Sequence, residues 1–486
     1  MADRKSYGDD RWVIVYGSYD GVEKYAVNEL YKIINGNVPY ILTLKNAQET
    51  GDLSLYNVVF IGTTENNRYL REYAQQGLFT PNEKAQGFCI KTMESPMNTE
   101  RRITILCGAD ARGVLYAVRD YRHFYVDAQR FNHFNTVYND PVRVFMEKMP
   151  DWEYSSAPHF LWRGAWSWGH VIYDYRRYID HMSEWKMNLL TLWNDHVPVN
   201  ARDVVEYAHA RGISVVWGHS WCWGETVDPD SAADLEKWST RIIETYEKEY
   251  RPLGVDGVYF QTFTEHADAA INGKSTAALA AEWVNKISAR LLDKYPQLWV
   301  QFGLHATSVR TDLPALRTVD PRLSIIWEDA GAFPFHHDPR NIEQCDETIE
   351  FTKEITRLRG EKECSGVVFK GLTMLNWLTF EHQKGPFVLG EADETFQRQY
   401  DEEHTFIWQY ANDYWARNLD VVLDTMSAVE TENCAKPPVM SVLLEDGAWE
   451  CAVQSAGALF AEAAWNPFRS AQEILEKVGL AREVRR

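Results

Sequence analysis

Strand-like and helix-like segments alternate along the first 150 residues. Short apolar runs, typical of strands, are separated by stretches in which apolar positions recur with helical periodicity. This pattern predicts a small α/β domain over residues 1–150, and a proline-interrupted linker with some strand content over residues 131–158. The predicted strands are residues 12–16, 40–44, 57–62, 88–91 and 103–107, and the predicted helices are residues 22–34 and 109–125.

From residue 161 the alternation continues at a longer period. Seven apolar runs are separated mostly by helical stretches, and a short eighth run lies near residues 386–389. This order predicts a parallel (β/α)8 barrel over residues 151–390, with a helical C-terminal region over residues 391–486. A doubly wound open sheet is the alternative, but no GxGxxG motif follows a strand. The seven runs are residues 161–168, 187–193, 213–217, 257–264, 298–305, 323–327 and 366–372.

Charge and composition narrow the class of protein. The 70 acidic and 50 basic residues give a net charge of -20, which disfavours binding to nucleic acid. No apolar run reaches the ~20 residues of a membrane span, and the N-terminus lacks the apolar stretch of a signal peptide, so we expect a cytoplasmic protein that binds no membrane. The seven cysteines are widely spaced without CxxC, which predicts reduced thiols. The 19 tryptophans suggest that a flat ligand is stacked.

The residues that follow the predicted strands are unusually aromatic and polar. In a (β/α)8 barrel these carboxyl ends form the active site. Indole faces suit the C–H side of a sugar ring, and polar side chains suit its hydroxyl groups, although any single tryptophan could equally be core packing. The candidate substrate-binding residues are Arg163, Trp166 and Trp168 on the first strand, Asn194, Asp195 and His196 after the second, His219 and Trp221 after the third, His266 after the fourth, His305 on the fifth, Trp327 on the sixth, and Lys370 and Trp377 on or beyond the seventh.

Carboxyl groups at two strand ends could cleave a glycosidic bond. Hydrolysis needs one carboxyl group as acid and a second as base or nucleophile. Glu265, after the fourth strand, is the predicted general acid, because partial burial there would hold its proton. Glu328 and Asp329, on the sixth strand, are the predicted base, and strand parity leaves open which of the two points inward. The alternative is that Glu265 only accepts a structural hydrogen bond and Glu328 only forms an ion pair.

Other motifs give weaker indications of chemistry. Asp195 is a second candidate base, although it fits better as a group that binds substrate hydroxyls. His336, His337 and Asp338 could hold a metal ion, but adjacent histidines on a loop are a weaker motif than HExxH. Cys222 has no base at a defined spacing. There is also no P-loop or GxSxG motif, which disfavours phosphoryl transfer and the chemistry of a hydrolase nucleophile elbow. We expect neither a metal nor an organic cofactor.

The order of domains resembles that of the glycoside hydrolase families 20, 67 and 84. The resemblance covers most of residues 1–390 and rests on residues 108–113, which close the small domain, on Arg163-Gly164 at the start of the barrel, and on a helix that leads to Lys186-Met187-Asn188. Families 20 and 84 use two adjacent carboxylates after the fourth strand, whereas here Thr264 and His266 flank Glu265.

The pattern is therefore closest to the alpha-glucuronidases of family 67. That resemblance implies that a lone Glu after the fourth strand, here Glu265, is the acid, and that Glu328 or Asp329 is the base. Strand seven carries Lys370 in place of that family's carboxylate. We expect a glycoside hydrolase, with Arg163 and Lys370 as candidate partners of a uronic acid carboxylate. The alternatives are a carbohydrate-binding barrel without catalysis and a polysaccharide lyase.

Overall fold

The structure is a computed structural model in which the chain forms two compact units. One unit comprises Met1–Pro158 with Ala210–Gly212 and Glu476–Arg486, and the other comprises His159–His209 and Ile213–Leu475. The described residues are 11–37, 42–127, 150–194, 196–219, 227–261, 268–328, 345–359, 364–370, 385–391, 404–432, 438–445, 447, 449–450 and 455–485.

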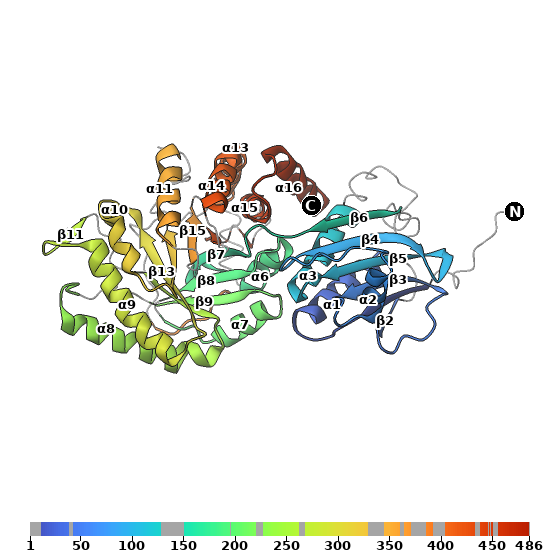
Figure 1. The fold of residues 1–486 in the computed structure, drawn as a ribbon, viewed down its shortest axis with the longest axis horizontal. Coiled ribbons are helices and arrows are strands. Elements are labelled where there is room, and N and C mark those ends of the chain that lie inside the picture. The colour runs from blue at the N-terminus through green and yellow to red at the C-terminus, as the bar shows by residue number, and fades with distance from the viewer. Residues whose placement is uncertain are drawn as a thin grey trace. The chain divides into compact units, whose positions relative to one another are not determined.

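The first unit is built on a six-stranded mixed sheet, which confirms the predicted α/β domain (Figure 1). Its strand order is β2-β1-β3-β5-β4-β6, with β4 antiparallel to both of its neighbours. Asp110 caps α3 by accepting a hydrogen bond from the Gly113 N–H group. The elements are β1 (Arg11–Tyr16), α1 (Gly21–Asn35), β2 (Leu42–Asn46), β3 (Tyr56–Gly62), α2 (Arg68–Gln75), β4 (Phe88–Ser95), β5 (Asn98–Gly108), α3 (Ala111–Asp120) and β6 (Trp152–Ser156).

The second unit is a closed barrel of eight parallel strands, as predicted (Figure 1). The seven predicted strands are present, but the position predicted for the eighth is wrong. Residues 386–389 form no strand, and the barrel is closed by β16 (Val439–Leu443), which lies between β15 and β7. The chain beyond residue 391 therefore contributes a strand to the barrel. The other strands are β7 (Trp162–Trp168), β8 (Leu189–Trp193), β9 (Ser214–Gly218), β10 (Gly257–Gln261), β13 (Trp299–His305), β14 (Ser324–Glu328) and β15 (Cys364–Phe369).

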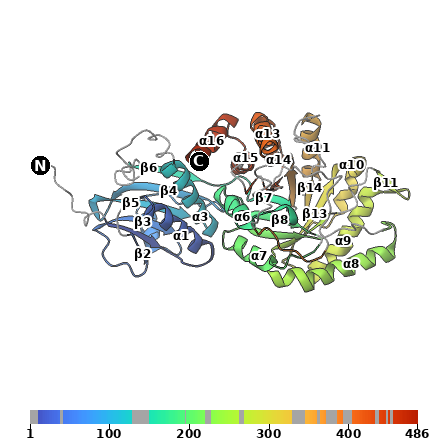
Figure 2. The ribbon, with the colours of Figure 1, turned by 180° about the vertical axis from the view of Figure 1, so that it is seen from behind.

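Helices follow most of the barrel strands and surround them (Figures 1 and 2). The described part of the segment between β15 and β16 holds two long helices, α13 (His404–Arg417) and α14 (Leu419–Glu432), which explains why counting strand–helix pairs misplaced the last strand. No helix in the described parts of the chain is long and apolar enough to cross a membrane. The other main helices of this unit are α6 (Tyr175–Glu184), α7 (Ala201–His209), α8 (Ala232–Thr245), α9 (Thr276–Lys294), α11 (Cys345–Leu358) and α15 (Ser455–Trp465). Most of α16 (Ala471–Arg485) belongs to the first unit.

The strand register shows which side chains face the barrel interior. Residues paired across parallel strands point to the same side, and successive residues alternate. Trp168 pairs with Trp193, and His305 pairs with Glu328. Trp166 contacts Tyr259 of β10, ring to ring, across the interior, which identifies the inward set. The inward positions at the carboxyl ends are therefore occupied by aromatic side chains on β7 and β8 and by polar ones on β10, β13 and β14.

Candidate functional site

A wall of indole rings covers one side of the carboxyl end of the barrel. Trp168 and Trp193 are stacked with centroids 4.5 Å apart and planes inclined by 12°. Trp166 meets both of them edge to face, at 6.3 and 5.8 Å. These side chains are buried because neighbouring inward positions of β7 and β8 hold them against each other. Trp166 and Trp168 were predicted from the sequence to bind substrate, whereas Trp193 was not among those candidates.

Polar side chains converge on the other side of the same opening. Glu328, the last residue of β14, accepts a hydrogen bond on Oε2 from Gln261 Nε2 at 3.2 Å. The same oxygen lies 3.0 Å from His305 Nε2, and the Gln261 amide also contacts that imidazole. The three residues end β10, β13 and β14, so the barrel itself brings them together. Because β14 lies four strands from β8 in the closed barrel, Glu328 faces the indole wall.

The Glu328 carboxyl group has an unusual affinity for protons. It is 2% exposed, and its burial raises its pKa from 4.5 to about 7. The positive charge of Lys370, which directly follows β15, opposes this rise. The structure thus decides the parity that the sequence left open for this residue, since Glu328 points into the barrel. A carboxyl group with a pKa near neutrality can both accept and donate a proton during turnover.

A second buried carboxyl group at this end was missed in the sequence. Glu445 is 2% exposed and lies two residues beyond Leu443, which pairs with the inward-facing Trp166. Its Oε1 accepts a hydrogen bond from the backbone N–H of Trp168 at 3.1 Å. The sequence signal was a carboxylate directly after the apolar run 439–444, and it was overlooked because the eighth strand was expected elsewhere.

Glu450, in the same loop, is a buried carboxyl group with a structural role. It accepts hydrogen bonds from the backbone N–H groups of Tyr173 at 2.9 Å and Asp174 at 3.5 Å. Burial raises its pKa to about 8, against the lowering effect of these backbone donors. Glu450 therefore connects the segment after β16 to the residues that begin α6.

Arg163 does not lie at the predicted site. It is the second residue of β7, and its guanidinium group donates to the carbonyl oxygens of Phe160, Leu161 and Lys186, which all precede strands. The guanidinium group also lies 5.1 Å from the ring of Trp465 on α15. It is fully buried at the amino end of the barrel, opposite the end that carries Lys370. The predicted joint contact of Arg163 and Lys370 with a substrate carboxylate is therefore wrong.

Two further candidates face the surrounding helices. Trp327 alternates with the inward-facing Glu328, and its ring contacts Phe351 of α11 at 5.2 Å. The imidazole of His219 lies 4.7 Å from the ring of Tyr250 and 5.5 Å from that of Phe260. Burial lowers the pKa of His219 to about 3, so it is neutral at physiological pH. The structure corrects both predictions, because it places these rings in the packing outside the barrel strands.

The remaining candidates are either near the opening or outside the described residues. Asn194 directly follows β8, and its buried side-chain amide has no hydrogen-bond partner among the described residues. His196 is exposed on the following turn. Ten residues singled out from the sequence lie outside the described residues: Asp195, Trp221, Cys222, Glu265, His266, Asp329, His336, His337, Asp338 and Trp377. Within the described chain no three His, Cys, Asp or Glu side chains form a metal-binding group.

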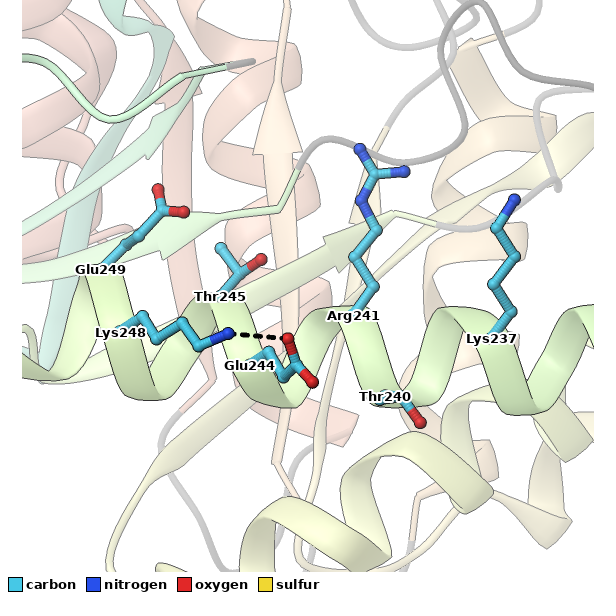
Figure 3. Close-up of a pocket in the computed structure, with 7 residues that line it drawn as sticks. All are labelled: Lys237, Thr240, Arg241, Glu244, Thr245, Lys248 and Glu249. Atoms are coloured by element: carbon cyan, nitrogen blue, oxygen red, sulfur yellow. Dashed lines mark hydrogen bonds and ion pairs between the residues drawn. The ribbon is translucent and has the colours of Figure 1, made fainter.

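A shallow pocket of about 280 Å³ lies elsewhere, on α8 and the turn that follows it (Figure 3). All of its lining residues come from this one helical stretch, and most are exposed. Lys248 and Glu244 form an ion pair across it at 2.8 Å. The pocket is a gap between long charged side chains, and it has none of the buried polar groups found at the carboxyl end of the barrel.

Comparisons with known proteins show a distant likeness of fold. No family model and no curated protein matches the chain. Similar solved structures include a family 18 chitinase from Pseudoalteromonas aurantia, with 10% identity, a TM-score of 0.35, and coverage of 61% of this chain and 99% of that chain. A D-psicose 3-epimerase from Clostridium cellulolyticum H10 has 10% identity, a TM-score of 0.33, and coverage of 65% and 99%.

A family 89 glycoside hydrolase from Clostridium perfringens is similar along 95% of this chain and 50% of its own, with 8% identity and a TM-score of 0.47. These structures are described as hydrolases and an epimerase. The resemblance of this chain to family 67 stays a prediction.

Proposed function

We propose that the protein is a glycoside hydrolase whose active site is the carboxyl end of the barrel. One observation carries the proposal: the stacked indole rings of Trp168 and Trp193 face the buried carboxyl group of Glu328 across the barrel. A sugar ring bound against the indoles would present its hydroxyl groups and its glycosidic bond to the polar side. A carboxyl group beside that bond is one of the two that glycoside hydrolysis requires.

Glu328 is our candidate for the general base. Its pKa of about 7 suits a group that takes a proton from water near neutral pH. Glu265 remains the candidate acid on the sequence argument alone, because it follows β10 by four residues. Asp329 remains the alternative base. Glu445 adds a further carboxylate at the same end, suited to accept a hydrogen bond from a substrate hydroxyl group.

The uronic acid preference has less support than the glycosidase proposal itself. It needs a cation that binds the substrate carboxylate, and Arg163 lies at the wrong end of the barrel. Lys370 remains as a candidate cation for the substrate carboxylate, but its positive charge already lowers the pKa of Glu328. A substrate carboxylate would have to share that ammonium group with the candidate base. Neutral glycosides therefore belong in the test beside the uronides.

A screen of aryl glycosides and oligosaccharides, both neutral and uronic, tests the proposal with products identified by mass. Gain of one water molecule on cleavage supports hydrolysis. An unsaturated, ultraviolet-absorbing product identifies a lyase instead. Saturable sugar binding without turnover of any compound indicates a carbohydrate-binding barrel, which the near-complete burial of Glu328 would then explain.

A further inference from the structure

Gly303 provides space for two oxygen atoms inside the barrel. It lies on β13 between Tyr259 of β10 and Glu328 of β14. A Cβ atom at residue 303 would lie 2.0 Å from the Tyr259 hydroxyl oxygen and 2.4 Å from Glu328 Oε1. Both distances are far below van der Waals contact, so any other residue here would displace one of these groups. The two oxygens therefore face each other across the space above this glycine.

Both oxygens are buried without a hydrogen-bond partner among the described residues. Tyr259 is fully buried, and neither its hydroxyl group nor Glu328 Oε1 makes a hydrogen bond there. A third unpaired polar atom, Gln301 Nε2, belongs to the next inward residue of the same strand. Leaving such groups unsatisfied costs about 1–3 kcal/mol each, so native proteins generally pair them with protein or water.

The two oxygens are close enough for one water molecule to bridge them. Since both lie near the same point above Gly303, their separation is at most about 4.4 Å, which a single bridging water can span. The surroundings are polar, as a buried water requires, and Gln301 offers a further donor in the neighbouring layer.

We propose that Tyr259 is a positioning residue for Glu328, acting through a water molecule held above Gly303. This inference rests on the proposed function, in which Glu328 is the base. The Tyr259 hydroxyl group donates to the water, and the water donates to Glu328 Oε1. The carboxyl group is then held on both oxygens, because Gln261 and His305 contact Oε2. It is fixed in orientation and its ionised form is stabilised.

Several charged and titratable groups surround Glu328, and a measurement of its pKa has to separate the effect of Tyr259 from the effects of the others. Among the described residues these are His305 from β13, Tyr259 from β10 and Lys370 after β15, with the neutral amide of Gln261 beside them. Of these groups, the Tyr259 hydroxyl shares the space above Gly303 with Oε1. Removal of its hydroxyl group should destabilise the ionised carboxylate and leave the groups at Oε2 unchanged.

Infrared titration of the carboxyl group in the full-length protein tests the proposal, with Glu328→Gln used to assign the signal. Tyr259→Phe keeps the ring and removes only the hydroxyl group. We expect it to raise the pKa of Glu328 by about one unit. Tyr250→Phe is the matched control, because the Tyr250 hydroxyl group donates to the Gly218 carbonyl and does not face Glu328. An unchanged titration in Tyr259→Phe overturns the proposal.

A high-resolution crystal structure tests the bridge itself. We expect ordered solvent within hydrogen-bond distance of both oxygens in the wild-type protein. An empty space above Gly303 would overturn the water bridge. The titration does not depend on turnover, so a shifted pKa in a protein that hydrolyses no glycoside would support the positioning role and refute the proposed function separately.

Discussion

Trp168 and Trp193 occupy paired positions on neighbouring barrel strands, and their indole rings lie parallel at 4.5 Å. Their side chains point inward at the carboxyl ends of β7 and β8. Stacking at this distance fixes both rings, so little side-chain freedom remains to be lost when a ligand binds. The pair is thus a rigid, buried aromatic layer at the end of the barrel where (β/α)8 enzymes bind substrate.

Replacement of one tryptophan in the cluster of Trp166, Trp168 and Trp193 should weaken substrate binding. Trp193→Leu removes one ring of the stacked pair, and we expect KM to rise about tenfold, since aromatic contacts contribute about 1–1.5 kcal/mol. Steady-state kinetics on the substrate found in the screen measures this. Trp327→Leu is the control, because that ring packs against Phe351 outside the barrel and should affect stability alone. Equal KM values for the wild type and Trp193→Leu would contradict the stacking role.

The buried carboxyl groups should make the protein less stable as pH rises. Folding raises the pKa of Glu328 from 4.5 to about 7 and that of Glu450 to about 8. Between these pH values the folded state binds protons that the unfolded state has released. The stabilisation is therefore complete below pH 4.5 and is lost as pH rises through 7 to 8.

Urea unfolding at pH 5 and pH 8 measures this dependence. Glu328→Gln and Glu450→Gln should each reduce the loss of unfolding free energy, by up to about 3 kcal/mol. Glu206→Gln, at an exposed position of α7, serves as the control and should leave the dependence unchanged. A pH dependence that both buried-site variants retain in full would show that these carboxyl groups are ionised in the folded protein at low pH.

Arg163 should matter for stability and not for substrate choice. Arg163→Met removes the guanidinium group and leaves the carbonyl oxygens of Phe160 and Lys186 unpaired. We expect a loss of about 3 kcal/mol in unfolding free energy, with an unchanged ratio of uronide to neutral glycoside turnover. The comparison is Lys370→Met, which should change activity because Lys370 acts on Glu328. A changed substrate ratio in Arg163→Met would contradict the structural assignment.

Replacement of Glu445 by glutamine should reduce activity and leave stability nearly unchanged. In Glu445→Gln the side-chain carbonyl can still accept the hydrogen bond from the Trp168 N–H group, so the fold should persist. We expect kcat/KM to fall at least tenfold, because glutamine offers a substrate hydroxyl group one acceptor oxygen where glutamate offers two. Glu450→Gln, nearby but bonded only to backbone N–H groups in the described residues, should retain activity. If both variants behave alike, Glu445 has no role at the site.

The sequence predicted the barrel because strand and helix periodicities are local signals. It failed where the answer depends on tertiary structure. The short apolar run of β16 follows two helices, and a rule that counts one helix per strand cannot find it. Glu445 was missed for the same reason, since it could be recognised only once β16 was known to be a barrel strand.

The errors at Arg163 and Trp327 have a different physical cause. Both residues are near predicted site residues in sequence, but one lies at the amino end of its strand and the other points to the helix side. Side-chain direction follows from the strand register, which single-sequence patterns leave open. For Glu328 the strand register decides a point that the sequence left open. Its pairing with His305 shows that its side chain points into the barrel.

We propose that the carboxyl end of this barrel hydrolyses a glycosidic bond by carboxyl catalysis. A comparison of turnover and binding by the wild type, Glu328→Gln and Glu265→Gln on one substrate from the screen tests this proposal. We predict that each variant loses at least 100-fold in kcat while its sugar affinity stays within a few-fold of the wild type. Unchanged kcat in both variants would contradict the claim.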